Sequence, residues 1–162
     1  MKELKTTDLC DSHADKVKIA EPIGFKDYGG KKLFNGKIYT VKCFEDNSFV
    51  RKALETNGEG KVLVVDGGGS MRCALLGDML ADLAIKNKWN GIIVYGCIRD
   101  SAAIGNLPLG VKALNTIPIK SNKKNIGEEN ISLHFAGIDF NPGEFVYCDE
   151  DGIIVSETEL AL

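Results

Sequence analysis

The stretch Lys61-Val-Leu-Val-Val-Asp66 determines the fold class, because it is nearly all apolar and lies between glycines. A short run of this kind, rich in β-branched valine, is typical of a strand that is buried on both faces of a sheet. The segment Gly91-Ile-Ile-Val-Tyr-Gly96 has the same character, and the residues between the two strands change to helical spacing over about 78–88. The sequence therefore predicts an α/β domain built on buried strands.

Shorter elements flank these two strands. Alternating apolar residues and turn signals predict further strands, and polar segments with helical spacing predict short helices. We expect strands over 17–23, 37–44, 72–76, 112–118, 131–135, 144–147 and 152–156, helices over 1–15 and 47–56, and irregular structure over 101–110 and 120–130. The pair Asp151-Gly152 favours a tight hairpin. The expected fold is therefore mixed sheets with short helices and several antiparallel connections, not a regular βαβ repeat.

The composition is that of one globular domain, which we place at residues 1–162. Hydrophobic residues make up 44% of the chain and charged residues 27%, as is usual for soluble proteins. The formal charge is −3 and the Lys and Arg residues are scattered, which argues against direct nucleic-acid binding. No apolar run reaches the roughly 18 residues that a membrane span requires, and the first residues lack the apolar core of a signal peptide. We expect a cytoplasmic protein that does not bind membranes.

Cysteine and histidine usage restricts the kind of metal the chain can hold. Five widely spaced cysteines without a Cys-x-x-Cys pair indicate neither a disulfide framework nor a thiolate zinc site. Cys43, Cys73 and Cys97 lie among apolar residues and are expected in the core. His13 and His134 are the only histidines, too few for a His-rich centre. A catalytic metal would therefore be a hard divalent cation held by oxygen, Mg²⁺ or Mn²⁺.

The glycine-rich segment Gly67-Gly-Gly-Ser70 directly follows the first buried strand and has two interpretations. Loops of this kind bind dinucleotides or S-adenosylmethionine when a helix follows and its N-terminus receives the ligand. Here residues 71–76 resemble a strand, and Arg72 occupies the position of the third glycine of Gly-x-Gly-x-x-Gly. We therefore favour a flexible turn in which the backbone approaches a neighbouring element.

Two further segments carry residues suited to chemistry. Gly77-Asp78-Met79-Leu80 lies where the chain enters a helix, whose free N–H groups are a ready seat for a carboxylate. The alternative is that Asp78 only caps or complements that helix. Arg99 and Asp100 follow the second buried strand, where α/β proteins commonly bind ligands. They form either a surface ion pair or an anion-binding guanidinium beside a metal-binding carboxylate.

Five segments form one recognisable pattern across the chain. They are Thr40-Val-Lys-Cys-Phe-Glu-Asp-Asn47, Val62-Leu-Val-Val-Asp-Gly-Gly-Gly-Ser70, Trp89-Asn-Gly-Ile-Ile-Val-Tyr-Gly96, Ile126-Gly-Glu128 and Asp151-Gly-Ile-Ile-Val-Ser156. With them, residues 20–156 resemble the regulator of ribonuclease E activity A (RraA) family, which includes the class II 4-hydroxy-4-methyl-2-oxoglutarate aldolases. The resemblance implies a swivelling β/β/α domain, like the phosphohistidine domain, assembled as a homotrimer with active sites at subunit interfaces.

The resemblance also implies roles for the two chemical segments. In the aldolases, backbone amides of a segment that corresponds to residues 77–80 hold the substrate carboxylate, and an Arg-Asp pair binds substrate and metal. Here Arg99 would bind substrate, Asp100 would bind the metal, and Asp78 would assist catalysis by orienting a metal-bound water. The regulatory type lacks both the Gly-Asp opening and the Asp after Arg, so this sequence favours catalysis. Longer aldolases add an acidic residue from a neighbouring subunit, to which we assign no counterpart here.

The expected function is that of a metal-dependent lyase acting on a small 2-oxo acid. The metal ion held by Asp100 and the guanidinium of Arg99 would stabilise negative charge on the keto oxygen as a C–C bond breaks. Retro-aldol cleavage of 4-hydroxy-4-methyl-2-oxoglutarate and decarboxylation of oxaloacetate both give the pyruvate enolate, so one site can serve both. A Schiff-base aldolase would need a desolvated lysine, whereas Lys61, Lys86 and Lys88 are expected in solvent. The alternative function is a non-catalytic regulator that binds a ribonuclease E-type protein.

Overall fold

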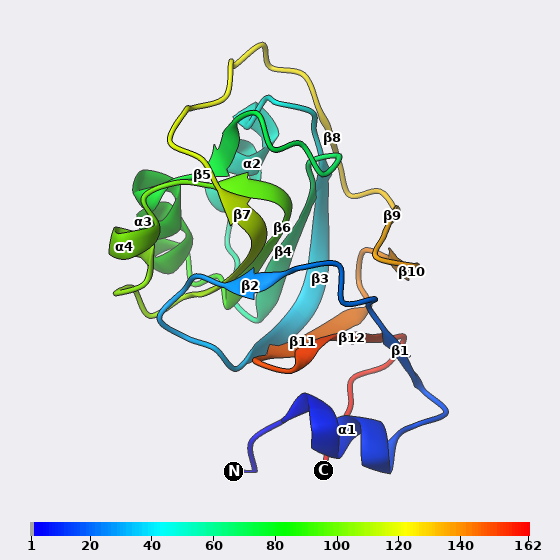
Figure 1. Ribbon diagram of the computed structural model, residues 1–162. Coiled ribbons are helices and arrows are strands. Elements are labelled where there is room, and N and C mark those ends of the chain that lie inside the picture. Colours follow the sequence, from blue (N-terminus) through cyan, green and yellow to red (C-terminus); the bar gives the residue numbers. More distant parts are fainter. Residues whose placement is uncertain (1) are drawn as a thin grey trace.

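The computed structural model describes residues 2–162. A ten-stranded mixed sheet has the order β1-β12-β11-β3-β4-β6-β7-β2, with β5 also paired to β6 and β8 to β3, and a second sheet joins β9 to β10. The strands are β1 Val17–Ile19, β2 Lys26–Asp27, β3 Phe34–Lys42, β4 Lys61–Asp66, β5 Ala74–Leu76, β6 Gly91–Ile98, β7 Gly110–Thr116, β8 Glu128–Glu129, β9 Leu133–Phe135, β10 Ile138–Phe140, β11 Phe145–Asp149 and β12 Gly152–Ser156. The helices are α1 Thr6–Ser12, α2 Ser48–Leu54, α3 Asp78–Lys86 and α4 Ser101–Ile104 (Figure 1).

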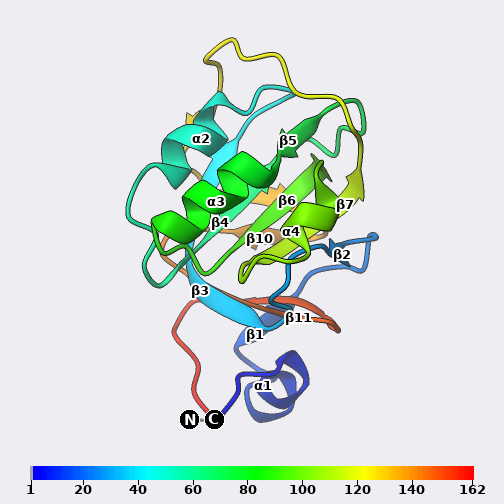
Figure 2. The ribbon, with the colours of Figure 1, turned by 90° about the vertical axis from the view of Figure 1, so that its left-hand side faces the viewer.

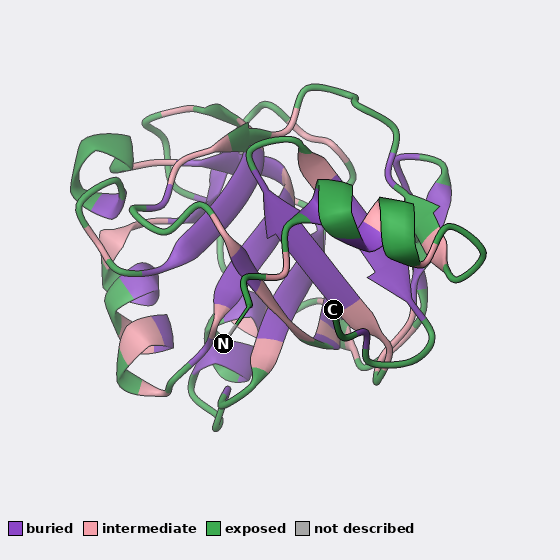
Figure 3. Cartoon of the chain, turned by 90° about the horizontal axis from the view of Figure 1, so that it is seen from below, coloured by how far each residue is buried: buried purple, intermediate pink, exposed green. Residues whose placement is uncertain are grey.

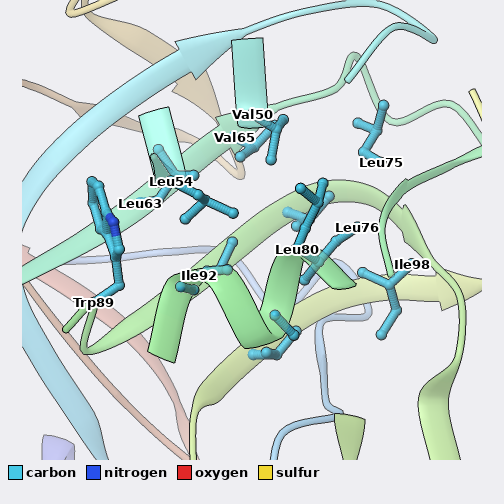
Figure 4. Packing of buried hydrophobic residues seen from close by; sticks show 14 of the residues in the cluster. Val50, Leu54, Leu63, Val65, Leu75, Leu76, Leu80, Trp89, Ile92 and Ile98 are labelled. Atoms are coloured by element: carbon cyan, nitrogen blue, oxygen red, sulfur yellow. The ribbon is translucent and has the colours of Figure 1, made fainter. Parts of the chain in front are cut away.

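The centre of the sheet consists of the parallel strands β3, β4, β6 and β7. Helices α2, α3 and α4 lie together on one face of these strands (Figure 2). Their apolar side chains pack with those of the sheet into one core, in which Leu54 and Leu80 of the helices meet Leu63 and Ile92 of the strands (Figure 4). Both faces of β4 are covered, so every residue of β4 after Lys61 is buried, which explains its uninterrupted apolar sequence.

The opposite face of the central strands packs against β-structure rather than helices. Val64 and Ile93 share a core there with residues of the β9–β10 hairpin and of β11 and β12. The Phe135 ring stacks between Tyr95, at a centroid distance of 4.8 Å, and Phe140, at 4.4 Å. The molecule therefore has a helical layer, a central sheet and a second β layer, as the expected β/β/α arrangement requires.

Helix α1 is largely exposed. In Figure 3, where the molecule is seen from below, it lies in front of the buried strands. Leu9 packs in a small cluster with Tyr147, Ile154 and Leu160. The Asp149 carboxylate accepts hydrogen bonds from the backbone N–H and the hydroxyl of Thr6, both at 2.7 Å. This carboxylate therefore satisfies a free N–H group at the first turn of α1 from another part of the chain.

The buried Lys112 joins two distant parts of the sheet. Its side chain on β7 is 3% exposed, and its ammonium donates a 2.5 Å hydrogen bond to the Asp149 carbonyl. The same nitrogen lies 3.1 Å from Asp27 Oδ1 on the edge strand β2. Within residues 2–162 that oxygen has no aligned hydrogen bond, so the contact is an ion pair without hydrogen-bond geometry. A buried lysine among these partners was not expected from the sequence.

Most predicted elements are confirmed, with shifted ends. The strand predicted at 61–66 has those bounds. The predicted hairpin is also present: β11 and β12 pair antiparallel, Asp151 lies in the turn between them, and Gly152 begins β12. Irregular structure was predicted over 101–110 and over 120–130. The first prediction is wrong at its start, because residues 101–104 form α4, and the second is wrong near its end, because residues 128–129 form β8. Cys43, Cys73 and Cys97 are buried as predicted, and Lys86 and Lys88 are exposed. Lys61 is only partly exposed, because it lies over the Tyr39 ring.

Candidate active site

Two neighbouring strands bring the predicted site residues together. Strand β5 ends at Leu76 just before the Gly77–Leu80 segment, and β6 ends at Ile98 just before Arg99 and Asp100. The two strands are parallel, with Leu76 opposite Ile98, and the Arg99 N–H donates to the Leu76 carbonyl at 2.9 Å. Because the carboxyl ends of parallel neighbours meet at one edge, the start of α3 and the Arg-Asp pair become adjacent.

The Asp100 carboxylate caps the helix that begins at Asp78. Its Oδ2 accepts a hydrogen bond from the Asp78 backbone N–H at 3.1 Å. Of the two alternatives for Asp78, capping of its own helix is wrong, because Gly77 holds the N-cap position and no side chain caps the helix from there. Asp78 does complement the helix, because it places an acidic side chain in the first turn. A β-carbon at Gly77 would lie 2.8 Å from Asp100 Oδ2 and within 3.5 Å of the Arg99 side chain. Glycine at this position therefore makes room for both functional side chains.

The backbone of Asp100 is held in the left-handed region, with φ of 57° and ψ of 39°. Few residues other than glycine adopt this conformation, which costs on the order of 1 kcal/mol and is enriched at functional sites. Asp100 is the N-cap residue of α4, but its side chain makes no bond to that helix. The carboxylate instead points toward α3, where it faces the helix N-terminus.

Unpaired donors lie at the start of α3 and on Arg99, near the Asp100 carboxylate. Within residues 2–162, the N–H groups of Met79 and Leu80 have no acceptor, and the half-buried Arg99 guanidinium has no ion-pair or hydrogen-bond partner. Within residues 2–162 no ion pair joins Arg99 to Asp100, so the alternative of a surface ion pair between them is wrong. Free N–H groups at a helix start, together with a free guanidinium, form a seat for a carboxylate ligand.

The donor set near Asp100 suits only one kind of metal. Residues 2–162 contain no group of three His, Cys, Asp or Glu side chains able to hold a metal ion. Asp78 is partly exposed and Asp100 is exposed, so both carboxylates are open to solvent. One or two carboxylate oxygens fit a hydrated hard cation such as Mg²⁺, which keeps most of its waters. They do not fit a site built from nitrogen or sulfur ligands.

The site lies on the open surface of the chain. One cavity of about 530 Å³ is lined by α1 and β12, and another of about 490 Å³ lies at the ends of β3 and β4. Neither cavity includes any residue of the Gly77–Leu80 segment, Arg99 or Asp100. Asp100 is exposed and Met79 is 74% exposed, so a single chain offers substrate an open surface with free donors and carboxylates.

Asn47 supports the site and was not singled out in the sequence. Its Nδ2 donates to the Leu75 carbonyl at 3.2 Å, in the strand that leads to Gly77. The Ser121 hydroxyl donates to Asn47 Oδ1 at 2.9 Å, which fixes the loop after β7 to the same place. The signal that identifies Asn47 is the run Asp-Asn-Ser directly after a strand, which is typical of a side-chain-stabilised turn before a helix.

Asp46, beside Asn47, holds the long loop that follows β7. Its carboxylate accepts hydrogen bonds from the N–H and hydroxyl of Ser48 and from the N–H groups of Lys124 and Ile126. Burial on its own raises the pKa of Asp46, but the hydrogen bonds from Ser48, Ile126 and Lys124 outweigh it and lower the pKa to about 2. The carboxylate is therefore ionised at neutral pH and ties the loop to the start of α2.

The glycine-rich loop is a turn whose backbone approaches a neighbouring strand, as predicted, and it is held there by hydrogen bonds. The N–H groups of Gly67 and Gly69 donate to the Tyr95 carbonyl, at 3.0 Å and 3.2 Å. The Gly68 N–H donates to Asp66 Oδ1 at 2.9 Å. The loop continues into β5 rather than into a helix. Its amides are therefore occupied within the chain, whereas nucleotide-binding loops leave them free for the ligand.

No helix within residues 2–162 is both long and apolar enough to cross a membrane.

Among known proteins, a relative from Aromatoleum aromaticum named "Putative 4-hydroxy-4-methyl-2-oxoglutarate aldolase" is 60% identical over 98% of this chain and 99% of its own. A relative of the same name from Pseudomonas aeruginosa is 54% identical over 97% of this chain and 96% of its own.

Two solved structures match along nearly the whole chain. The S-adenosylmethionine: 2-dimethylmenaquinone methyltransferase from Geobacillus kaustophilus has a TM-score of 0.95 and 50% identity, over 97% of both chains. The RNA-processing inhibitor RraA from Thermus thermophilis has a TM-score of 0.94 and 42% identity, over 99% of this chain and 96% of its own. The RraA-like family model, described as Aldolase/RraA, matches residues 6–155. With its β/β/α layers and its Gly-Asp and Arg-Asp segments joined at one sheet edge, the chain belongs to the RraA-like family.

Proposed function

We propose that this protein is a divalent-metal-dependent lyase that cleaves 4-hydroxy-4-methyl-2-oxoglutarate to pyruvate and decarboxylates oxaloacetate. The observation that carries the proposal is the Asp100 carboxylate, which lies beside the free N–H groups of α3 and next to the unpaired Arg99. This arrangement combines an oxygen ligand for a hard cation with donors for an anionic substrate. The relatives named as aldolases support the same activity.

Each residue has a distinct task in the proposed reaction. The N–H groups of Met79 and Leu80 bind the carboxylate of the 2-oxo acid at the positive end of α3. The Arg99 guanidinium donates to the keto oxygen and stabilises the negative charge that develops there as the C–C bond breaks. Asp100 would hold Mg²⁺ or Mn²⁺, which acts as a Lewis acid when bound. Asp78 orients solvent near the reacting atoms through its partly exposed side chain.

Both substrates fit this arrangement because their reactions converge. In the retro-aldol cleavage, the 4-hydroxyl gives its proton to solvent, its oxygen becomes the keto oxygen of one pyruvate, and the C3–C4 bond breaks; in oxaloacetate, the bond to the departing carbon dioxide breaks. Each bond leaves its electron pair on the carbon beside the remaining keto group. The pair delocalises onto the keto oxygen and gives the pyruvate enolate, which Arg99 stabilises in either case. Protonation of the enolate carbon then gives pyruvate.

A homotrimer would complete the site. Asp100 and Met79 are exposed in the single chain, and within residues 2–162 no third His, Cys, Asp or Glu side chain joins Asp78 and Asp100 in a metal-binding group. A neighbouring copy would cover the open side, exclude water and strengthen the electrostatic interactions in the site. Acidic residues of that copy would be available as further ligands.

A second candidate function is a regulator that binds a ribonuclease E-type protein. Its support is the 42% identity with the RNA-processing inhibitor from Thermus thermophilis. Methyl transfer has less support, despite the name of the Geobacillus structure, because the amides of the glycine-rich loop are already bonded within the chain.

The test is an assay of pyruvate formation from oxaloacetate and from 4-hydroxy-4-methyl-2-oxoglutarate. We expect activity with Mg²⁺ or Mn²⁺, loss of activity with a chelator, and recovery when the metal is restored. Activity that persists in the chelator would contradict the metal-dependent reaction. No turnover of either substrate with any divalent metal, in protein that is folded, would favour the regulator.

A further inference from the structure

A cavity on the face of the sheet that is turned away from α3 is unused by the proposed reaction. It lies at the carboxyl ends of β3 and β4, against β6 and the segment that leads into β8, and has a volume of about 490 Å³. That segment is the yellow part of the chain at the upper end of the molecule in Figure 1. Open α/β sheets commonly bind ligands outside the carboxyl ends of their strands. We name it the β4 cavity; its lining includes Lys42, Phe44, Asp66, Tyr95, Ile126 and Glu128.

Three of these side chains form a row across the sheet. Lys42 is paired in register with Asp66, and Asp66 with Tyr95, in the parallel ladders that join β3, β4 and β6. Side chains alternate between the two faces along a strand, so neighbours in register share one face. The Tyr95 ring stacks on Phe135 of the second β layer, which places the row on the side of that layer. The row forms one wall of the β4 cavity.

Asp66 is a buried carboxylate with one oxygen free. Only 8% of the residue is exposed, and its Oδ1 accepts the Gly68 N–H at 2.9 Å. Within residues 2–162 its Oδ2 accepts no hydrogen bond and no ion pair. In this part of the chain, the one side-chain oxygen or nitrogen that lacks both a partner and solvent contact belongs to Asp27, so Asp66 Oδ2 is open to the cavity. A carboxylate oxygen in this position is stabilised by a charged donor.

Lys42 supplies the opposite charge. Its side chain is exposed, and within residues 2–162 it pairs with no carboxylate, not even that of the adjacent Asp66. Glu128 is also exposed and unpaired, and adds to the attraction for a positive group. Because neighbouring strands lie about 4.8 Å apart, a ligand that satisfies both Asp66 and Lys42 carries its positive and negative charges close together.

The β4 cavity also has an exposed apolar part. Phe44 is 59% exposed and Ile126 is 65% exposed, and both line this cavity. The Phe44 ring lies over the glycine-rich loop, where a β-carbon at Gly68 would be 2.9 Å from it. Single exposed apolar residues are common, but two that line one hollow mark a binding surface more strongly. An apolar group bound between them removes their surface from water.

We propose that the β4 cavity binds a free α-amino acid with an apolar side chain. The ammonium group of the amino acid donates to Asp66 Oδ2, its carboxylate accepts from the Lys42 ammonium, and its side chain packs against Phe44 and Ile126. A simple amine lacks the group that pairs with Lys42, and a simple carboxylic acid lacks the donor that Asp66 requires. The inference goes beyond the proposed lyase activity. The site uses residues of one chain, and the test uses the protein as it assembles in solution.

The probe is 4-fluoro-L-phenylalanine, observed by fluorine NMR while the full-length protein is titrated into it. We expect saturable line broadening with a Kd on the order of 1 mM. The amine 4-fluorophenethylamine lacks the carboxylate, and 3-(4-fluorophenyl)propionate lacks the ammonium group. Each should bind at least about threefold more weakly, because one charged contact is lost. Unlabelled leucine should displace the probe more effectively than serine does.

Three variants test the residues of the site. Asp66→Asn keeps an oxygen acceptor for the Gly68 N–H but removes the charge, and it should weaken binding about tenfold, the size of a hydrogen bond to a charged group. Lys42→Met should weaken it by up to about fivefold, as the loss of an exposed charge pair does. Phe44→Ser should also weaken it. Thermal unfolding of each variant separates loss of binding from loss of the fold.

The matched control is Lys37→Met, which removes another exposed lysine of β3 without an ion pair within residues 2–162, and it should leave binding unchanged. No saturable broadening, or equal binding of the amine or the acid, would overturn the proposal. So would unchanged binding in Asp66→Asn and Lys42→Met, or an equal loss in Lys37→Met. Absent binding, together with dissociation of the protein into single chains in Phe44→Ser by sedimentation, would assign the cavity to a second copy. The readout is binding, so failure of the lyase assay leaves this result unaffected.

Discussion

The Asp100 carboxylate accepts the backbone N–H of Asp78 at 3.1 Å, so the proposed metal ligand is also the N-terminal cap of α3. The two tasks are separable by substitution. Asp100→Asn keeps an oxygen acceptor and a residue that tolerates the left-handed backbone, but removes the negative charge. We expect it to lose lyase activity while its thermal unfolding stays close to that of the wild type.

Asp100→Ala removes both the charge and the cap. We expect the same loss of activity, together with a loss of about 1 kcal/mol in the free energy of unfolding, the usual size for a missing cap. Urea unfolding and the pyruvate assay, run on both variants, measure the two effects. Full activity in Asp100→Asn would show that the Asp100 carboxylate is not a metal ligand.

Gly77→Ala tests whether the close approach at Gly77 positions the site. Its β-carbon would meet Asp100 Oδ2 at 2.8 Å and the Arg99 side chain beyond it. Gly77 has φ of −129°, so alanine brings no backbone strain there. We expect a loss of at least about tenfold in kcat/KM, because a small misplacement of reacting groups has large effects.

The control for Gly77→Ala is Gly105→Ala, at the end of α4, where the new β-carbon would lie 3.3 Å from the Ser101 carbonyl and the backbone is helical. We expect this variant to keep most of the activity. Equal losses in both variants would mean that Gly77 has no special role in positioning Asp100.

Asp46→Asn tests the loop anchor through its pH dependence. The pKa of Asp46 is lowered from 3.8 to about 2, because hydrogen bonds from Ser48, Ile126 and Lys124 outweigh the effect of burial. A lowered pKa in the folded state adds stability above the ordinary pKa, and this is lost as the pH falls through about 2. The contribution is on the order of 2 kcal/mol.

We therefore expect wild-type stability to fall between about pH 4 and pH 2, and this slope to flatten in Asp46→Asn. Asp82→Asn, at an exposed position in α3, should keep the wild-type slope. Urea unfolding at a series of acidic pH values measures both. Identical slopes in the wild type and Asp46→Asn would contradict the anchor.

Local patterns predicted the parts of the fold that depend on local sequence. Strand β4 is found at the predicted bounds because burial on both faces makes its sequence uniformly apolar. Helix α4 was missed because it has only four residues, too few to show helical periodicity in the sequence. It directly follows Asp100, whose backbone is in the left-handed region. The approach of Asp100 to Asp78 depends on the register between β5 and β6, which no single segment encodes. The prediction that these residues share one site came from the resemblance to a known family and not from their spacing in the sequence.

The buried Lys112 shows the same limit of sequence reasoning and gives the last prediction. Its partners, Asp27 and the Asp149 carbonyl, come from distant parts of the chain, so nothing near Lys112 in the sequence indicates burial. Removing one partner of a buried ion pair leaves the other charge uncompensated, at a cost of about 3 kcal/mol. We expect Lys112→Met and Asp27→Asn each to lower the free energy of unfolding by about that amount. The double variant should be more stable than the sum of the two losses implies, because neither charge is then left alone. Urea unfolding at neutral pH gives the coupling energy, and strictly additive losses would mean that the ion pair does not join β2 to β7.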